Sequence, residues 1–141
     1  MTSEPRYLLD TNAISHMMRD PLGPVAQRAF AIEAQNGSSA MCTCVIVQCE
    51  LLFGLARRSS PKWTVQYQRV MESLEVMPLE ATVSTHYARL RTHLEQQGTP
   101  IGANDTLIAA HALALGATLV TADAEFARVP GLAVENWLRQ K

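Results

Sequence analysis

Long apolar runs, lysines and aspartates are scarce in this chain of 141 residues. No apolar stretch approaches the roughly 20 residues that a helix needs to cross a bilayer. The polar segment Met1–Arg6 leads directly into a strand-like segment and does not resemble a secretory signal. Repeats, low-complexity segments and long linkers are also missing. These absences predict a cytoplasmic protein without a membrane segment.

Cysteine is scarce as well, and its number is odd. Cys42, Cys44 and Cys49 are clustered within apolar sequence, which predicts reduced and largely buried thiols rather than a disulfide framework. A Cys-x-Cys pair followed by a third cysteine can bind a soft metal, but no second cysteine or histidine cluster completes a zinc set. A zinc site is therefore disfavoured.

The net charge of −1 gives the chain no general attraction to nucleic acid. The basic residues are nevertheless unevenly distributed. One cluster consists of Arg57, Arg58 and Lys62, and a second of Arg89, Arg91 and His93. Such clusters are usually solvated helix faces, but they still permit a basic rim around an acidic site.

Composition and length suit one folded domain over residues 1–141. Hydrophobic residues make up 48 % of the chain and charged residues 18 %, which is ordinary for a globular protein that can bury a core. Strand-like apolar runs alternate with helical segments. Strands are expected at residues 7–9, 40–44, 75–77, 118–121 and 132–134, and helices at residues 13–18, 25–35, 45–57, 61–73, 82–97 and 106–115.

This alternation of strands and helices implies right-handed crossovers and a mostly parallel sheet. We therefore predict a single α/β domain with a central sheet of four to five strands flanked by helices. In the helix expected at residues 45–57, apolar residues recur at spacings of three and four, which predicts a buried stripe. The stripe consists of Ile46, Cys49, Leu52, Phe53 and Ala56.

Four carboxylates stand at or near junctions between apolar runs and turns or helices: Asp10, Glu50, Asp105 and Asp123. Asp10 and Asp123 follow two predicted strands, and Asp105 lies in the first turn of a predicted helix. In open parallel sheets, ligands bind beyond the carboxyl ends of the strands, where helix N-termini also point. Glu50 lies about one turn into the helix after the second strand, and its longer side chain can reach back to that edge.

Each of these acids also has an ordinary structural interpretation. Aspartate caps helices and makes turns at such positions, and a single glutamate on a helix is usually solvated. Their common location favours a joint role, because gathered carboxylates repel one another unless a cation lies between them. Asn12 and Asn104 add neutral oxygen donors beside two of the acids, and Thr121 can hydrogen-bond a carboxylate or water.

Mg²⁺ or Mn²⁺ is the natural counterion for such a set of oxygen ligands. Two such ions about 4 Å apart can activate water and stabilise the leaving oxygen in phosphodiester cleavage. We expect Asp10 and Asp105 to make the most direct metal contacts. Glu50 and Asp123 are expected to hold a second ion or to orient ligand water.

Four segments resemble the acidic motifs of PIN-domain ribonucleases. They are YLLDTN at residues 7–12, CELLFG at residues 49–54, PIGAND at residues 100–105 and LVTAD at residues 119–123. The order of these motifs and the tail from Phe126 to Trp137 are similar to VapC-type toxins of bacterial toxin–antitoxin pairs. The likeness extends over essentially the whole chain, and four motifs in register make it specific.

The resemblance implies a compact PIN fold, a Mg²⁺- or Mn²⁺-dependent endoribonuclease and inhibition by a cognate VapB-type antitoxin. It also implies a homodimer and an antitoxin whose C-terminal segment wraps the toxin near its acidic groove. An RNA substrate follows from the resemblance alone, and single-stranded loops are the accessible targets.

Matched to the motifs, the acidic catalytic and metal-binding set is Asp10, Glu50, Asp105 and Asp123. The fourth motif departs from the pattern of many relatives, because the turn at residues 122–125 is shorter here. Glu125 therefore stays open as a residue that shares or replaces the role of Asp123.

Other α/β enzymes fit the sequence less well. A phosphoacceptor receiver domain needs a lysine after a late strand, and neither Lys62 nor Lys141 is so placed. A haloacid-dehalogenase-type phosphatase needs a second aspartate where Asn12 stands. None of the four histidines is paired by spacing with a nucleophilic residue, and His111 is expected to be a hydrogen-bonded buried or interface histidine. The main alternative is a catalytically silent PIN-like domain that binds RNA or a protein.

Overall fold

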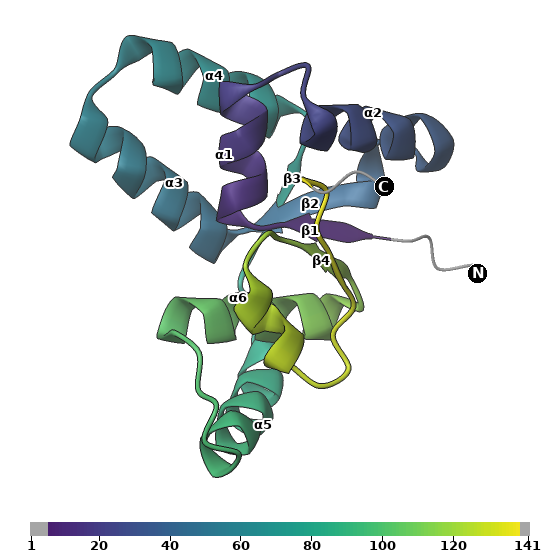
Figure 1. Cartoon of the computed structure of the whole chain (residues 1–141), viewed down its shortest axis with the longest axis vertical. Coiled ribbons are helices and arrows are strands. Elements are labelled where there is room, and N and C mark those ends of the chain that lie inside the picture. Colours follow the sequence, from purple (N-terminus) through teal and green to yellow (C-terminus); the bar gives the residue numbers. More distant parts are fainter. Residues whose placement is uncertain (1–5, 139–141) are drawn as a thin grey trace.

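The computed structural model describes residues 6–138, which form an α/β domain around one parallel sheet (Figure 1). The strands are β1 (Tyr7–Leu9), β2 (Met41–Cys44), β3 (Glu75–Met77), β4 (Thr118–Val120) and β5 (Val134–Glu135), in the order β3-β2-β1-β4-β5. The predicted fold class is thus confirmed. The expected domain limits at residues 1 and 141, and the polar segment before Arg6, lie outside the described residues.

Helices cover both faces of this sheet. Helices α1, α2 and α4 lie above it in Figure 1, whereas α5 and α6 pack against each other below it. The helices are α1 (Thr11–Arg19), α2 (Pro24–Asn36), α3 (Val45–Arg58), α4 (Pro61–Glu72), α5 (Thr82–Gln96) and α6 (Ala103–Leu115), with short 3₁₀ helices η1 (Ser38–Ala40) and η2 (Ala124–Arg128). Because every crossover between neighbouring strands contains a helix, the parallel pairing is the one expected for this order of elements.

Strand β1 is the centre of the sheet, and its position determines where the first acid lies. It pairs in parallel with β2 on one side and β4 on the other, and its residues Leu8 and Leu9 are fully buried. The backbone N–H of Asp10 then donates to the carbonyl of Val120 at 2.9 Å. The strand pairing therefore continues up to Asp10, which stands at the carboxyl edge of the sheet.

The buried face of α3 differs from the predicted one. Val47 and Leu51 are its buried residues, whereas Leu52 and Phe53 are 47 % and 63 % exposed. Helix α3 carries two apolar stripes, and periodicity alone does not tell which of them faces the sheet. Ile46 is partly buried against the core, but the other members of the predicted stripe are exposed, so the prediction that the stripe is buried was wrong for Cys49, Leu52, Phe53 and Ala56.

Two further residues differ from their predicted surroundings. Cys42 and Cys44 are buried free thiols as expected, but Cys49 is exposed because it lies on the outer side of α3. His111 in α6 is buried as expected, yet its Nδ1 atom has no hydrogen-bond partner among residues 6–138, so it is not the satisfied histidine that was predicted.

Element boundaries shift by a few residues at several places. Helix α6 begins at Ala103 rather than at residue 106, because Gly102 is its extended N-cap. The last strand comprises Val134–Glu135 rather than residues 132–134. Over the described residues, no helix has both the length and the apolar character needed to cross a membrane.

Candidate metal centre at the carboxyl edge of the sheet

Asp10 is the most deeply buried acid of the candidate site. It directly follows β1, is 4 % exposed and stands at the N-cap position of α1. Its side chain nevertheless makes no capping hydrogen bond to the helix. Helix capping therefore does not account for a buried aspartate at this position.

A hydrogen-bond network holds the Asp10 carboxylate from the β4 side. The Thr121 hydroxyl donates to Asp10 Oδ2 at 2.8 Å, and the Asn12 amide donates to Thr121 Oγ1 at 3.0 Å and to Asp10 Oδ2 at 3.3 Å. The Asn12 amide oxygen accepts from the backbone N–H of Ala122 at 2.9 Å. Asn12 was expected to offer a neutral oxygen to a cation, but this oxygen is already used to connect α1 to the turn after β4.

Glu50 reaches the edge from α3, as its position one turn after β2 predicts. Its Oε1 atom accepts a short hydrogen bond of 2.5 Å from the Thr11 hydroxyl, at the start of α1. This contact joins two segments that are 39 positions apart in sequence. Because β1 and β2 are neighbouring strands, the helices that follow them start side by side and bring Thr11 and Glu50 together.

The other acids come from the opposite side of the edge. One carboxylate oxygen from each of Asp105, Asp123 and Glu125 lies within 4.8 Å of the other two. Asp105 belongs to the first turn of α6, while Asp123 precedes η2 and Glu125 lies within it. Asp123 also acts as a cap, because its Oδ1 accepts from the backbone N–H of Glu125 at 2.9 Å. The capping interpretation of Asp123 is thus correct, but it uses only one of the two oxygens.

The pKa values show that the acids influence one another. Burial raises the pKa of Asp105 to about 6, and the negative charges of Asp10, Asp123, Glu50 and Glu125 act in the same direction. Burial likewise raises the pKa of Asp10, with smaller contributions from Glu50 and Asp123, whereas the nearby Thr11 backbone and the hydrogen bond from the Thr121 hydroxyl lower it. Five carboxylates therefore share one region, where ionising all of them is unfavourable without a cation.

This donor set fits a hard divalent cation. Carboxylate oxygens are the ligands that Mg²⁺ and Mn²⁺ prefer. Carboxylates that lie close together ionise fully only when positive charge is present. Asp105, Asp123 and Glu125 have oxygens close enough together to bind the same ion. Asp10 and Glu50 carry hydrogen bonds from Thr121 and Thr11 that fix their orientation toward the same edge.

The comparisons with known proteins identify the family of the chain. The sequence pattern of the PIN domain matches residues 7–132. The chain belongs to the PIN domain family. Among curated PIN-domain relatives, "Ribonuclease VapC2" of Rickettsia felis is 36 % identical over 133 residues, which cover 93 % of this chain and 97 % of that protein. The "tRNA(fMet)-specific endonuclease VapC" of Salmonella typhimurium is 29 % identical over 134 residues, covering 94 % and 98 % of the two chains.

Solved structures of PIN-domain proteins have the same architecture. The structure of VapBC2 from Rickettsia felis, bound to a DNA fragment from its promoter, matches with a TM-score of 0.84 at 34 % identity and covers 93 % of this chain and 98 % of that one. DNA-bound VapBC from Salmonella typhimurium matches with a TM-score of 0.79 at 29 % identity, covering 94 % and 98 %. The predicted resemblance to VapC-type PIN domains is thereby confirmed.

The structure brings the four predicted acids near one another, but sequence reasoning missed part of their surroundings. The structure places Asp105 and Asp123 in one compact group with Glu125, whose participation had been left open. Asp10, which was expected to contact the metal most directly together with Asp105, and Glu50 lie outside this group. The Thr121 hydroxyl bonds a carboxylate, as expected. Thr11 was not recognised as a partner of Glu50, although a hydroxyl directly after an acidic strand end is a signal that could have suggested it.

Proposed function

We propose that this chain is the toxin of a toxin–antitoxin pair and that it cleaves RNA phosphodiester bonds as a metal-dependent endoribonuclease. The ion proposed is Mg²⁺, with Mn²⁺ as a substitute. The observation that carries the proposal is the group of three acids at the sheet edge, because one carboxylate oxygen from each of Asp105, Asp123 and Glu125 lies within 4.8 Å of the other two. Membership of the PIN domain family and the likeness to VapC ribonucleases support the reaction class.

The acids have distinct roles in this proposal. Asp105, Asp123 and Glu125 would hold the ion through their neighbouring oxygens. Asp10 and Glu50 complete the catalytic and metal-binding set on the other side, oriented by Thr121 and Thr11. When bound there, a divalent cation would supply positive charge to a phosphate and would help to activate water for attack.

The substrate proposed is RNA with accessible single-stranded loops. The Salmonella relative, at 29 % identity, is named for cleavage of tRNA(fMet), whereas the Rickettsia relative, at 36 % identity, carries only the name of a ribonuclease. The first RNA to test is therefore unfractionated tRNA, because its loops expose bases and backbone.

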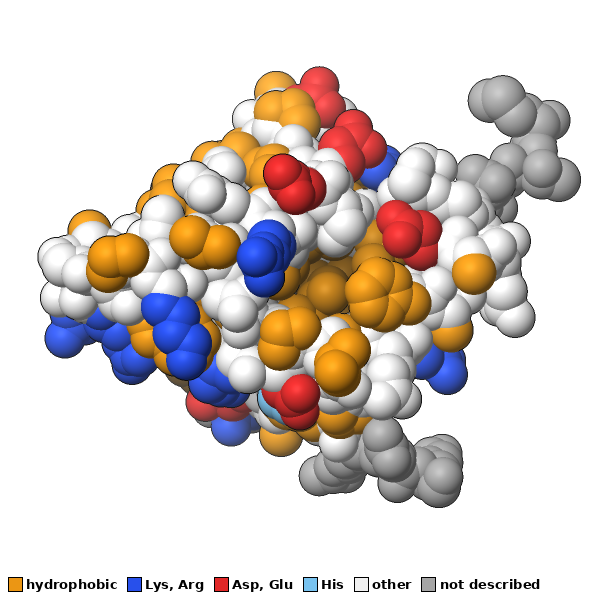
Figure 2. Space-filling model, turned by 90° about the horizontal axis from the view of Figure 1, so that it is seen from above, with side chains coloured by type: hydrophobic (Ala, Val, Ile, Leu, Met, Phe, Trp, Pro, Cys, Tyr) orange, Lys and Arg blue, Asp and Glu red, His pale blue; other side chains and the backbone are white. Residues whose placement is uncertain are grey.

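A VapB-type antitoxin is the proposed protein partner. The neighbouring structures are complexes of the VapBC type, and the upper face of this chain has an apolar area that fits a bound segment. Figure 2 shows hydrophobic side chains gathered in the middle of that face. Phe30 of α2 is 61 % exposed beside a cavity of about 180 Å³ between α2 and α4. Exposed apolar area of this kind is typical of a protein-binding surface.

The homodimer stays a prediction, and the outer side of α3 is the surface we propose for it. Leu52 and Phe53 are exposed there. Two copies of one helix face can bury such residues against each other around a two-fold axis. Sedimentation equilibrium of the purified chain measures whether a dimer forms.

A metal titration tests the proposed activity. Purified protein stripped with EDTA is expected to leave tRNA intact, and Mg²⁺ or Mn²⁺ is expected to restore cleavage and raise the melting temperature by binding the folded state. Expression without an antitoxin is expected to arrest growth. A catalytically silent PIN-like domain would instead show no cleavage and no thermal shift at millimolar metal, and its expression would leave growth unimpaired.

A further inference from the structure

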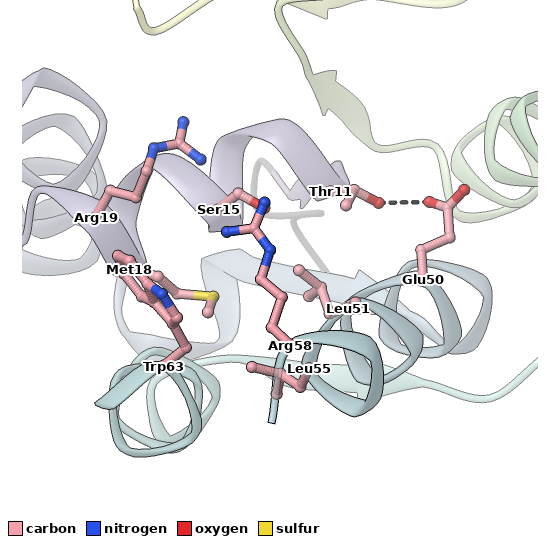
Figure 3. A pocket seen from close by; sticks show the side chains of 10 residues that line it. Thr11, Ser15, Met18, Arg19, Glu50, Leu51, Leu55, Arg58 and Trp63 are labelled. Atoms are coloured by element: carbon pink, nitrogen blue, oxygen red, sulfur yellow. Dashed lines mark hydrogen bonds between the residues drawn. The ribbon is translucent and has the colours of Figure 1, made fainter. Parts of the chain in front are cut away.

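A pocket beside the acids has features that the proposed metal chemistry does not explain. It lies between α1, α3 and α4 and has a volume of about 240 Å³. Thr11 and Glu50 line one end of it (Figure 3), so the pocket adjoins the candidate acids through Glu50. Pockets for drug-sized ligands span about 300–1,000 Å³. This smaller pocket is therefore suited to a single base or a single large side chain.

A glycine in the wall of the pocket is the first sign that something binds there. Gly54 lies in the interior of α3, where glycine destabilises a helix relative to alanine. A Cβ atom at this position would meet no heavy atom within 4 Å. Neither backbone conformation nor packing within the described residues requires glycine, and Gly54 is one of the residues that line the pocket.

The charges around the pocket indicate the kind of ligand. Arg19 and Arg58 line it, and neither forms an ion pair with an acid within residues 6–138. Figure 3 shows Arg58 extending from α3 toward Ser15 of α1, with Arg19 at the end opposite Glu50. A polyanion that approaches five carboxylates is repelled unless cations lie along its path. The two arginines supply positive charge next to the acidic edge.

The remaining wall is apolar and suits a planar base. Met18 and Leu51 are buried in it, and Trp63 lies beside Met18 (Figure 3). The Lys62 ammonium lies 5.2 Å from the centre of the Trp63 ring and adds positive charge at the same place. Aromatic surface together with basic side chains is how proteins hold single-stranded nucleic acid without a fixed sequence.

We propose that this pocket binds the nucleotide adjacent to the scissile phosphate, with its base against Gly54 and Trp63 and its phosphate on Arg58 and Arg19. The inference rests on the ribonuclease function proposed above and assigns a substrate subsite to it. A protein segment that neutralises the acidic edge would itself carry positive charge, which Arg19 and Arg58 repel. The charges therefore favour RNA over a protein segment as the occupant.

The test uses two pocket variants and a matched control on the same helix. Arg58→Gln removes a pocket cation, and Gly54→Ala places a methyl group in the pocket, whereas Arg57→Gln removes a cation that stacks on Phe53 outside it. Binding of fluorescein-labelled unfractionated tRNA and of a random single-stranded RNA pool is measured by anisotropy in EDTA, where no metal-dependent cleavage occurs. The full-length chain is used throughout.

Both pocket variants are expected to weaken RNA binding by about tenfold, the effect of losing one charge-assisted or close apolar contact, while Arg57→Gln binds like the wild type. Gly54→Ala is also expected to raise the melting temperature, which separates lost binding from lost folding. With Mg²⁺ present, the nucleotide preference next to the mapped cleavage sites is expected to change in the pocket variants.

Three results would overturn the inference. The wild-type protein could bind neither RNA sample, or the pocket variants could bind RNA as tightly as Arg57→Gln does. In the third, the pocket variants would bind RNA normally and weaken only the complex with the antitoxin. The last result would assign the pocket to the protein partner. A different result would separate the two proposals. If RNA binding depends on Arg58 and Gly54 but the wild-type protein cleaves no RNA with any divalent ion, the proposed activity is contradicted and the pocket is still supported as an RNA site.

Discussion

The Thr121 hydroxyl donates a hydrogen bond of 2.8 Å to Asp10 Oδ2 across 111 positions of sequence. The two residues follow the neighbouring strands β4 and β1, so the parallel pairing of these strands brings them together. This hydrogen bond lowers the pKa of Asp10, against the larger effect of burial that raises it. Thr121 is therefore a positioning residue, which keeps the buried carboxylate oriented and more easily ionised.

Replacing Thr121 by valine tests this role. Thr121→Val keeps the shape of the side chain but removes the donor, so we expect metal-dependent RNA cleavage to fall by about 10- to 100-fold, as for other residues that orient metal ligands. The loss is expected to be larger at low pH, because the pKa of Asp10 rises further. Thr121→Ser restores the hydroxyl and is expected to recover most of the rate. Equal pH profiles for Thr121→Val and the wild type would contradict the positioning role.

Asp105 is expected to destabilise the metal-free fold. Its pKa is about 6 in the folded chain and 3.8 in its ordinary state. Between these values the unfolded chain has released its proton while the folded chain keeps it, so the stability of the metal-free protein falls as the pH rises from about 4 to about 6. Asp105→Asn removes this dependence and is expected to gain about 1 kcal/mol at pH 7, allowing for solvent screening.

Urea denaturation in EDTA at a series of pH values measures this effect. The same variant is expected to lose the thermal stabilisation that Mg²⁺ gives the wild type. If Asp105→Asn is less stable than the wild type at pH 7 without metal, the carboxylate is held by favourable contacts and the electrostatic explanation of the site is wrong.

The relative roles of Asp123 and Glu125 can be separated by two isosteric changes. Asp123→Asn keeps a side chain able to cap η2 but loses its charge, and Glu125→Gln loses the neighbouring charge. Because both oxygens lie within 4.8 Å of Asp105 and of each other, we expect each change to weaken Mg²⁺ binding by about tenfold or more in calorimetric titrations.

A glutamate on the exposed surface of α5 provides the control for this pair. Glu95 pairs with Arg91 at 2.9 Å, and Glu95→Gln is expected to leave Mg²⁺ binding unchanged. Mg²⁺ affinity that is unaffected by Glu125→Gln would leave Asp123 alone as the fourth acid.

The buried His111 is expected to make the stability of the fold depend on pH. Burial lowers its pKa from the ordinary value of 6.5, with Glu80 acting weakly in the opposite direction. The unfolded chain therefore takes up the proton first, and stability is expected to fall as the pH drops below about 6.5. His111→Leu is expected to remove this part of the pH dependence, whereas His93→Gln, on the exposed side of α5, is expected to retain it. Identical slopes for the two variants would show that His111 does not titrate.

The sequence predicted the fold and the location of the site because both depend on local patterns. Alternating apolar runs and helical segments specify a parallel sheet, and acids at strand ends then meet at one edge. The exposed stripe of α3 could not be assigned in the same way, because Val47 and Leu51 compete with Leu52 and Phe53 for the core and only tertiary packing selects between them.

The finer arrangement of the acids depends on contacts between distant segments. The proximity of Glu125 to Asp105 depends on the 3₁₀ turn after β4, whose conformation no periodic pattern specifies. The use of the Asn12 oxygen by the Ala122 backbone likewise requires α1 and that turn to be placed side by side. Such partners follow from the folded geometry rather than from sequence spacing.

The most direct measurement of the central claim is the single-turnover rate of RNA cleavage by Asp10→Asn and Asp105→Asn in saturating Mg²⁺. The matched control is Asp20→Asn, because Asp20 is the remaining aspartate of the chain and follows α1 at its far end. We predict that both site variants fold and cleave no RNA above background, while Asp20→Asn cleaves at the wild-type rate. Cleavage at the wild-type rate by either site variant would contradict the claim that these carboxylates form the catalytic metal centre.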